Sequence, residues 1–164
     1  MLRWAVPDDA EELADVHVTT WQTAYEDIFP SQFLDALDRG TRSRWWRRFI
    51  ERGARVHVAE VERVVGFCHP GPSDDEGWGE IFSIYVRPDR WGEGHGQELL
   101  QAGEQTLVAG GHQRALLWVL EANARGRHFY ERQGWTAGKP IRVEEIGGVQ
   151  VTELRYEKDL SGGH

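Results

Sequence analysis

The first third of the chain has hydrophobic residues at helical spacing. A short apolar segment at the N-terminus predicts a strand, and a helix follows with Asp8 as N-cap and Glu11 as its capping-box partner. The residues that share one face of this helix are Leu13, His17, Trp21 and Ala24. Two shorter helices are predicted next, over residues 31–37 and 41–53, with Ser31 and Thr41 as their caps.

The middle of the chain alternates apolar and polar residues with the period of a strand. Residues 56–61 and 64–69 predict the two strands of a hairpin, and residues 70–77 predict a loop rich in proline, glycine and aspartate. Residues 80–86 predict a further strand, which Pro88 ends.

The last part of the chain mixes both patterns. The elements predicted there are a helix over 96–109, a strand over 114–120, a helix over 123–133 and strands over 141–146 and 149–156. The first of these strands is almost entirely apolar, which is typical of a buried central strand. Gly147-Gly148 predicts a hairpin turn between the last two strands. The strand–helix–strand order implies parallel pairing in the sheet, so the chain is predicted to be mixed α/β.

Composition limits the class of protein. The 164 residues fit one domain, expected over residues 1–160, with residues 161–164 as a frayed tail. The chain has one cysteine, no signal-peptide core and no apolar run close to the roughly 20 residues that span a bilayer. We therefore expect a cytoplasmic protein with no membrane partner. The net charge of −8 argues against binding to nucleic acid and is compatible with a cationic substrate such as an amine.

Three alternating glycines lie between a predicted strand and the helix after it: Gly92, Gly94 and Gly96. Glycine lets backbone N–H groups turn toward a ligand, and the helix start adds unpaired N–H groups with a partial positive charge. These features predict a site for an anion such as a pyrophosphate, although the spacing fits neither a phosphate loop nor a dinucleotide fingerprint. Glu93 adds a negative charge that Arg87 and Arg90 would offset. A flexible strand-to-helix connection is the alternative.

Two segments carry a family resemblance. The first is Tyr85-Val86-x-Pro-x-x-Trp-Gly-x-Gly-x-Gly-x-x-Leu-Leu, and the second combines Asn123, Gly126, Phe129-Tyr130 and Gly134-Trp135. In this order and spacing they resemble the acetyl-CoA motifs of the GNAT superfamily of N-acetyltransferases. Trp91 stands where the family usually has arginine or glutamine, and it resembles a variant found in acetyltransferases of the ribosomal-protein type.

The resemblance covers nearly the whole chain and implies the fold. We expect the α/β (α+β) GNAT fold, with a mixed central sheet of about six to seven strands flanked by about four helices. In this family the fourth strand splays from the fifth, commonly at a β-bulge.

The resemblance also implies that acetyl-CoA is the cosubstrate. Its pantetheine arm would pair with the main chain of Ile84 and Val86, and its diphosphate would lie on the amides of residues 91–96. Asn123 would hydrogen-bond the pantetheine, and it is also the predicted N-cap of its helix. The residues expected at the cofactor are Ile84, Tyr85, Val86, Trp91, Gly92, Glu93, Gly94, His95, Gly96, Gln97, Asn123, Arg125, Phe129 and Tyr130.

In the family a neutral amine attacks the thioester directly, so an acid and a base are expected. Tyr130 is the expected acid, because a phenol with a pKa of about 10 can donate a proton as a thiolate with a pKa of about 8.5 forms. Glu80 is the expected base, with His57, His69 and Tyr25 as weaker alternatives. Structural roles stay open for both main candidates: a packed tyrosine, and a solvent-facing carboxylate at a strand end.

The expected acceptor is a primary amine of a small molecule. The aromatic residues expected near it are Trp21, Tyr25 and Phe29, with Trp45 and Trp46, and the region of residues 141–149 would also contribute. The same rings would equally serve as the core of the helical layer. Two alternatives remain: acetylation of a protein or peptide N-terminus or lysine, and a non-catalytic acyl-CoA-binding sensor. No side-chain cluster has metal-ligand spacing, so no metal is expected, and a homodimer stays open.

Overall fold

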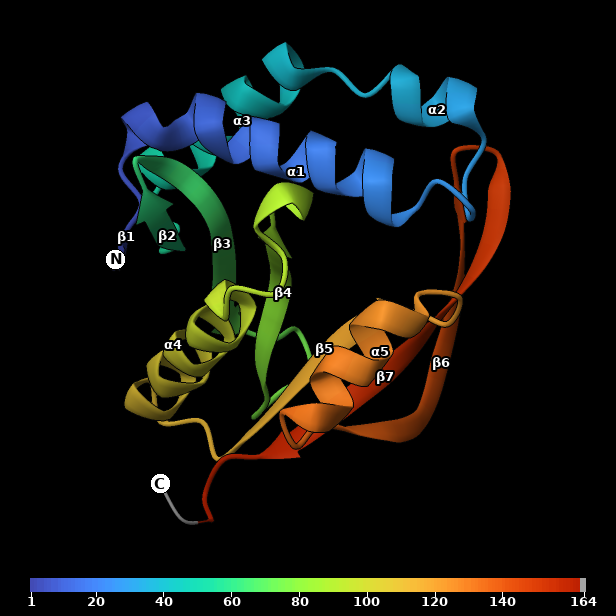
Figure 1. Cartoon of the computed structure of the whole chain (residues 1–164). Helices are drawn as coiled ribbons and strands as arrows, with labels where there is room; N and C mark the ends of the chain where they lie inside the picture. Colours follow the sequence, from blue (N-terminus) through green and yellow to red (C-terminus); the bar gives the residue numbers. More distant parts are fainter. Residues whose placement is uncertain (163–164) are drawn as a thin grey trace.

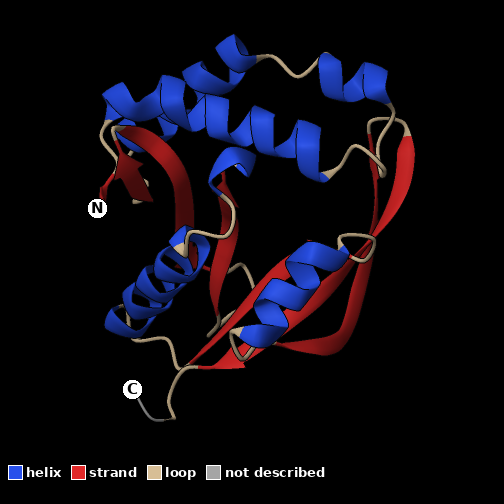
Figure 2. Cartoon of the chain, in the orientation of Figure 1, coloured by secondary structure: helices blue, strands red, loops and turns tan. Residues whose placement is uncertain are grey.

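The computed structural model describes residues 1–162, which form one mixed sheet with helices on both of its faces (Figure 1, Figure 2). The sheet has seven strands in the order β1-β2-β3-β4-β5-β7-β6. The strands are β1 Leu2–Trp4, β2 His57–Val61, β3 Arg63–Pro72, β4 Gly79–Val86, β5 Arg114–Leu120, β6 Thr136–Ile146 and β7 Val149–Asp159. The helices among the described residues are α1 Ala10–Ala24, α2 Ser31–Asp35, α3 Arg39–Glu51, α4 His95–Ala109 and α5 Ala124–Arg132.

Three predicted helix starts are corrected by the structure. A 3-10 turn, Pro7–Asp9, precedes α1, and Asp8 points outward to pair with Arg47 at 3.1 Å instead of capping the helix. The N-cap of α2 is Pro30 and not the predicted Ser31. α3 begins two residues before the predicted Thr41, because the Asp38 carboxylate accepts the N–H groups of Gly40 and Thr41 and caps the helix there.

β3 and β4 form a longer hairpin than predicted. β3 continues through Pro70 to Pro72, so the loop begins three residues later than predicted. His69 pairs with Ser83 and Pro70 with Ile81, which leaves Phe82 as the extra residue of a bulge in β4. A bulge suits this position, because proline has no N–H to donate to the neighbouring strand.

β4 and β5 meet at one end and then separate, as the fold class requires. Their parallel register joins Gly79 to Ala115 and Glu80 to Leu116, and beyond these pairs the strands diverge (Figure 1). The other neighbouring strands pair in antiparallel registers. The splayed pair within a mixed sheet of seven strands confirms the predicted fold class.

Residues of β3 build cores on opposite faces, and a register shift that leaves Val65 without a partner on β2 interrupts the strict alternation between the faces. Val65 and Cys68 of β3 pack with α4 in one core, whereas Val64 and Phe67 pack with α1 and α3 in another. α4 lies very close to the sheet, since a Cβ on Gly103 would meet the Cys68 Sγ at 2.7 Å. α5 covers the same face as α4, over β5 and β7 (Figure 1).

The predicted frayed tail lies partly outside the described residues, because residues 163–164 are not among them. Ser161 is described, and its backbone N–H and hydroxyl both donate to the Asp159 carboxylate, at 2.8 and 2.6 Å.

Candidate active site between β4 and β5

A cleft of about 660 Å³ occupies the gap between the diverging strands. It passes through the sheet, since its walls include α5 on one face and side chains of β6 and β7 on the other. The predicted site residues that line it are Trp21, Tyr25, Glu80, Ile84, Tyr85, Val86, Trp91, Gly92, Gly94, His95, Gly96, Gln97, Asn123, Arg125, Phe129 and Tyr130. Among the described residues, the candidates outside this lining are Glu93, Phe29, Trp45, Trp46, His57 and His69.

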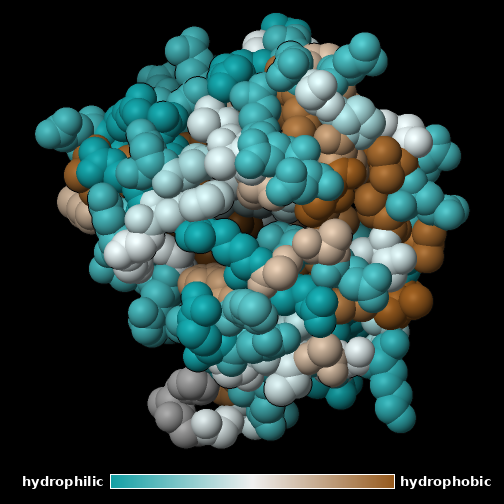
Figure 3. Space-filling model, turned by 45° about the vertical axis from the view of Figure 1, so that its right-hand side comes forward, coloured by the Kyte–Doolittle hydropathy of each residue, from teal (hydrophilic) through white to brown (hydrophobic). Residues whose placement is uncertain are grey.

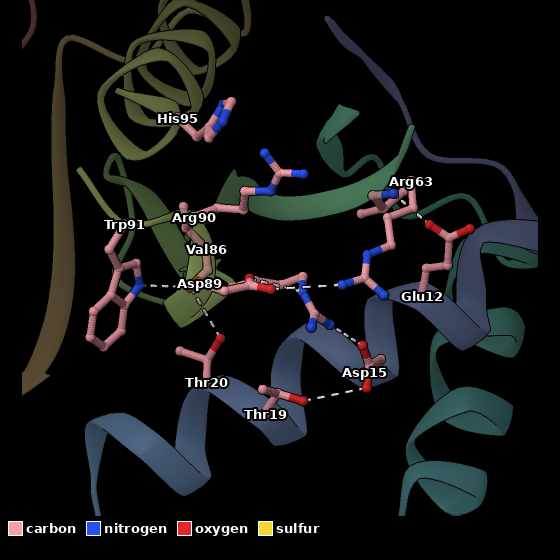
Figure 4. Close-up of polar contacts among 12 residues, drawn as sticks. Glu12, Asp15, Thr19, Thr20, Arg63, Val86, Asp89, Arg90, Trp91 and His95 are labelled. Carbon is pink, nitrogen blue, oxygen red and sulfur yellow. Dashed lines mark hydrogen bonds and ion pairs between the residues drawn. The ribbon is translucent and has the colours of Figure 1, made fainter. Parts of the chain in front are cut away.

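The backbone of the upper part of β4 faces the cleft. The Arg87 N–H donates to the Val65 carbonyl at 2.8 Å, so Tyr85 and Arg87 turn their backbone groups toward β3. Because an antiparallel strand alternates, Ile84 and Val86 turn theirs toward the gap. The Val86 carbonyl accepts the Trp91 Nε1–H at 2.8 Å and the Thr20 hydroxyl at 3.3 Å (Figure 4). The tryptophan in the family's arginine position therefore fixes the end of β4.

The glycine-rich turn requires glycine at two positions. Gly92 and Gly94 have φ values of 86° and 90°, which side-chain-bearing residues rarely adopt. Gly96 lies against the Phe129 ring, where a Cβ would come within 3.3 Å. α4 begins at His95, so its first N–H groups have no partner within the helix and lie at the cleft with the positive end of the helix dipole.

The charges of the turn differ from the expectation at two residues. Glu93 turns out of the cleft and pairs with His95 at 3.0 Å and with Arg90 at 3.6 Å. Arg87 does not offset Glu93, because it forms ion pairs with Asp15 and Asp89 instead. Figure 4 shows Arg90 and His95 together near the start of α4, and Asp15 apart from them on α1.

Two basic side chains at the cleft, His128 and Arg132, were not singled out from the sequence. Arg90 also lines the cleft, and the predicted Arg125 places its guanidinium 3.8 Å from the Trp91 ring centre. The amides of the helix start and these side chains together form a wall suited to a bound anion.

Tyr130 reaches the cleft from α5, on the face that carries α4. Its ring packs edge-on against Phe129 at 5.3 Å and lies 6.3 Å from Tyr156. Burial raises the pKa of Tyr130, and the nearby Tyr85 and Cys68 raise it further. The phenol is therefore protonated at neutral pH, the form that can donate a proton.

Glu80 reaches the cleft from the opposite face. Ile81 belongs to the core under α4, so Glu80, its neighbour on the strand, points the other way. Its carboxylate accepts the Ser73 hydroxyl at 2.8 Å. Burial raises the pKa of Glu80, while Ser73 and Arg142 lower it, and the balance is upward. A raised pKa makes a carboxylate a stronger base.

The three alternative bases, His57, His69 and Tyr25, are less suited than Glu80 to accept a proton in the cleft. His57 lies on β2 and bonds to the Thr106 hydroxyl at 2.7 Å, and His69 lies beside Phe82 with a pKa lowered by burial to about 4. Neither His57 nor His69 is among the described residues that line the cleft. Tyr25 does line it, but burial raises the pKa of Tyr25 well above its usual value.

Asn123 caps α5 as predicted. Its side-chain oxygen accepts the Gly126 N–H at 3.0 Å, and the same residue lines the cleft. A Cβ at position 126 would meet the Asn123 amide nitrogen at 2.5 Å. The glycine that replaces the family's usual alanine therefore leaves room for the folded-back asparagine.

Only some of the aromatic residues predicted to lie near the acceptor line the cleft. Trp21 donates its Nε1–H to the Tyr85 hydroxyl at 3.0 Å and lines the cleft with Tyr25. Phe29 stacks behind Trp21 with 5.8 Å between ring centres and is 4% exposed, so it belongs to the core. Trp46 is also core, in line with the alternative role in the helical layer, and Trp45 lies beside it on α3 outside the cleft lining.

The wall formed by β5, β6 and β7 includes Trp118, Arg142, Ile146 and Glu153. Arg142 and Ile146 belong to the predicted region of residues 141–149, whereas Trp118 and Glu153 were not predicted as site residues. Arg142 and Glu153 are direct partners across the hairpin and form an ion pair at 2.8 Å. Counting back from the Gly147-Gly148 turn would have paired them, but the sequence does not reveal which face of the hairpin meets β4.

Within residues 1–162, no three histidine, cysteine or acidic side chains group together in a way that could hold a metal ion. No helix in this part of the chain has the length and hydrophobicity to cross a membrane.

The opened sheet, the glycine-rich helix start and the tyrosine on α5 form the arrangement of an N-acetyltransferase. Residues 13–135 match the model of the acetyltransferase (GNAT) family, so the chain belongs to this family of acyltransferases. It is 33% identical over 160 residues to YuaI of Bacillus subtilis, an uncharacterized N-acetyltransferase, and the match covers 93% of this chain and 89% of that one.

Two solved structures share the fold. A GCN5-related N-acetyltransferase from Rhodopseudomonas palustris has a TM-score of 0.77 and 22% identity over 97% of this chain and 94% of that one. The PaiA N-acetyltransferase from Thermoplasma acidophilum, solved with coenzyme A, has a TM-score of 0.73 and 18% identity over 97% of this chain and 99% of that one.

Proposed function

We propose that this N-acetyltransferase uses acetyl-CoA and transfers the acetyl group to a primary amine of a small molecule. The observation that carries the proposal is the cleft through the sheet, which has a proton donor on one face and a raised-pKa carboxylate on the other. A neighbour of the same fold was solved with coenzyme A, which supports the choice of cofactor.

The residues of the cleft fit this cofactor. The backbone groups of Ile84 and Val86 face the gap and are suited to an amide-containing arm such as pantetheine. The first N–H groups of α4, with Arg90 and Arg125 near them, are suited to a diphosphate. Asn123 is already engaged as a helix cap, so it would contribute its remaining amide N–H groups.

Bound acetyl-CoA would supply the acetyl group as a reactive thioester. Glu80 accepts the proton of the acceptor ammonium, directly or through water, which leaves a neutral amine as nucleophile. Tyr130 would donate its phenol proton to the departing sulfur from the other face, and the second proton that the amine loses as the amide forms would restore the phenol through solvent. Because the two residues approach from opposite sides of the sheet, the incoming amine and the leaving thiol do not compete for one position.

A closed acceptor end favours a small molecule over a polypeptide. The tip of the β6–β7 hairpin packs on the segment after α1, where Leu120 and Val151 join Tyr25 and Phe29 in one core (Figure 1). A Cβ on Gly147 at the tip would meet the Phe33 ring at 2.6 Å. This contact closes one side of the cleft, and a protein chain laid across it would have to separate the hairpin from α2.

The test measures acetyl-CoA binding by calorimetry and release of free thiol with a panel of amines. We expect Tyr130→Phe and Glu80→Gln to lower kcat by about 100-fold while acetyl-CoA binding changes little. Tyr156→Phe is the matched control, because this buried hydroxyl donates to Glu131 at 2.6 Å outside the cleft.

A different result would contradict each part of the proposal: the cofactor, the catalysis and the small-molecule acceptor. Folded protein that takes up no acetyl-CoA would disprove the cofactor. Binding without thiol release from any amine or peptide would favour a non-catalytic sensor. Turnover confined to peptides would favour acetylation of protein N-termini or lysine side chains.

A further inference from the structure

The cleft wall on β6 carries the guanidinium of Arg142, which has no role in the proposed acetyl transfer. Arg142 lines the cleft, and its side chain is 44% exposed. It lies on the face of the sheet that carries Glu80, since it pairs across β7 with Glu153 and the neighbouring Leu154 belongs to the core on the other face. Its charge is therefore presented on the acceptor side.

Two neighbours hold the Arg142 side chain in one orientation. Its Nε donates to Glu153 at 2.8 Å, and its Cζ lies 4.4 Å from the ring centre of Trp118. The second carboxylate nearby, Glu144, is 3.8 Å from the same Nε. Among the described residues, both ion pairs of Arg142 thus run through Nε, and the edge formed by the two Nη groups is left for another partner.

That edge is suited to one kind of group. A guanidinium presents its N–H donors as a planar fork, which matches the two oxygens of a carboxylate. Stacking on an aromatic ring fixes the plane of the fork and lowers the entropy lost when a ligand binds. Glu153 is a counter-ion that positions the Arg142 guanidinium through Nε and leaves the two Nη groups for a ligand.

Arg142 is also close to the proposed position of the amine. It lies near enough to Glu80 for its positive charge to lower the pKa of that carboxyl. An acceptor whose ammonium faces Glu80 therefore has the Arg142 guanidinium within reach of a nearby substituent.

We propose that the acceptor is an amine that also carries a carboxylate, as amino acids do, and that Arg142 binds this carboxylate. The inference rests on the proposed function and narrows its substrate class. The ammonium faces Glu80, the carboxylate faces Arg142, and apolar parts of the acceptor lie against Phe82, Trp118 and Ile146, which also line the cleft. A lysine side chain or a protein N-terminus lacks a free carboxylate next to its amine.

The test compares each L-amino acid with its carboxamide in the thiol-release assay. We expect kcat/KM to be about 10- to 100-fold higher for at least one amino acid than for its carboxamide, mainly through KM, because hydrogen bonds to charged groups have this magnitude. Arg142→Gln should abolish the preference, and Arg142→Lys should restore part of it. The KM for acetyl-CoA should not change.

A binding measurement separates this role from a structural one. Calorimetry with the N-acetylated amino acid and its amide should show that Arg142→Gln weakens only the carboxylate compound. Arg47→Gln is the matched control, since Arg47 pairs with Asp8 on the surface at 3.1 Å.

Three results would overturn the inference: equal use of carboxamides, an equal effect of Arg142→Gln on both compounds, or no turnover of any pair by protein that binds acetyl-CoA. Failure to bind acetyl-CoA would instead overturn the proposed function itself.

Discussion

At the scale of single residues, Glu80 carries a conflict between stability and activity. Its carboxyl is half-buried at the start of β4, and burial raises its pKa against the opposing effects of Ser73 and Arg142. The ionised form that serves as a base is therefore the form that the folded protein accommodates less well.

Glu80→Gln should stabilise the protein at neutral pH while removing activity. The folded pKa lies above the unfolded value of about 4.3, so the folded state binds the extra proton between the two. Stability conferred by Glu80 therefore falls as pH rises through that window. We expect Glu80→Gln and wild type to unfold at similar denaturant concentrations near pH 4, and the variant to be more stable at pH 8.

Glu76→Gln is the control for this comparison, because Glu76 is exposed on the loop before β4. A variant at position 80 that is less stable than wild type at pH 8, with an unchanged control, would contradict the assigned environment of the carboxyl.

At the scale of elements, the connection between β3 and β4 fastens the two halves of the sheet at the base of the cleft. Asp75 pairs with Arg155 of β7 at 2.6 Å, and the guanidinium groups of Arg114 and Arg155 lie 4.2 and 4.6 Å from the centre of the Trp78 ring. Within the loop, the Ser73 N–H donates to the Trp78 carbonyl at 2.9 Å. The loop therefore holds the Ser73 hydroxyl on Glu80.

Ser73→Ala should change the pH dependence of the reaction. Loss of the hydroxyl removes a hydrogen bond that lowers the pKa of Glu80, so that pKa rises. The acidic limb of the profile of kcat/KM against pH should move to higher pH, and Ser73→Thr should return it. Ser43→Ala on α3 is the control, and an unshifted limb in Ser73→Ala would exclude Ser73 as a positioning residue.

At the scale of the whole molecule, the sheet consists of two parts that meet at the short β4–β5 register. β1 to β4 carry α1, α3 and α4, and β5 to β7 carry α5 (Figure 1). A space-filling view turned toward β6 and β7 shows hydrophobic residues gathered on one side of that face and polar residues over much of the rest (Figure 3). A ligand in the cleft would link the two parts through the free edge of β4.

Acetyl-CoA should therefore protect particular amides from hydrogen exchange. We expect exchange at Ile84 and Val86 to slow by at least about tenfold on binding, because their backbone groups face the gap. The Arg87 amide is the internal control, since it already donates to Val65 across the hairpin at 2.8 Å. Equal protection of all three amides would indicate general stabilisation instead of pairing along β4.

Much of the fold follows from local patterns. The apolar run of β5, the cap at Asn123 and the Gly147-Gly148 turn each predict an element that the structure contains, because backbone geometry at these sites depends on nearby residues. The helix starts near Asp8 and Thr41 were predicted less well. Neighbouring polar residues compete for the cap: Asp38 caps α3 in place of Thr41, and Asp8 pairs with Arg47 instead of capping a helix.

Side-chain direction at the cleft was the least predictable property. Glu93, Phe29 and Trp45 have the chemistry expected of site residues, yet they lie outside the cleft lining, and Arg142 was predicted only as part of the region of residues 141–149. The spacing of residues along the chain does not report how two distant segments face each other.

The sequence by itself determined the elements, the positive-φ glycines of the turn and the family motifs, because these depend on residues close together in the chain. The tertiary structure decided where β4 leaves β5, and so which face each side chain of β4, β6 and β7 presents to the cleft. The direction of these side chains depends on packing between segments as distant as those of Glu80 and Arg142. The pattern of residues along one segment does not include the energy of this packing.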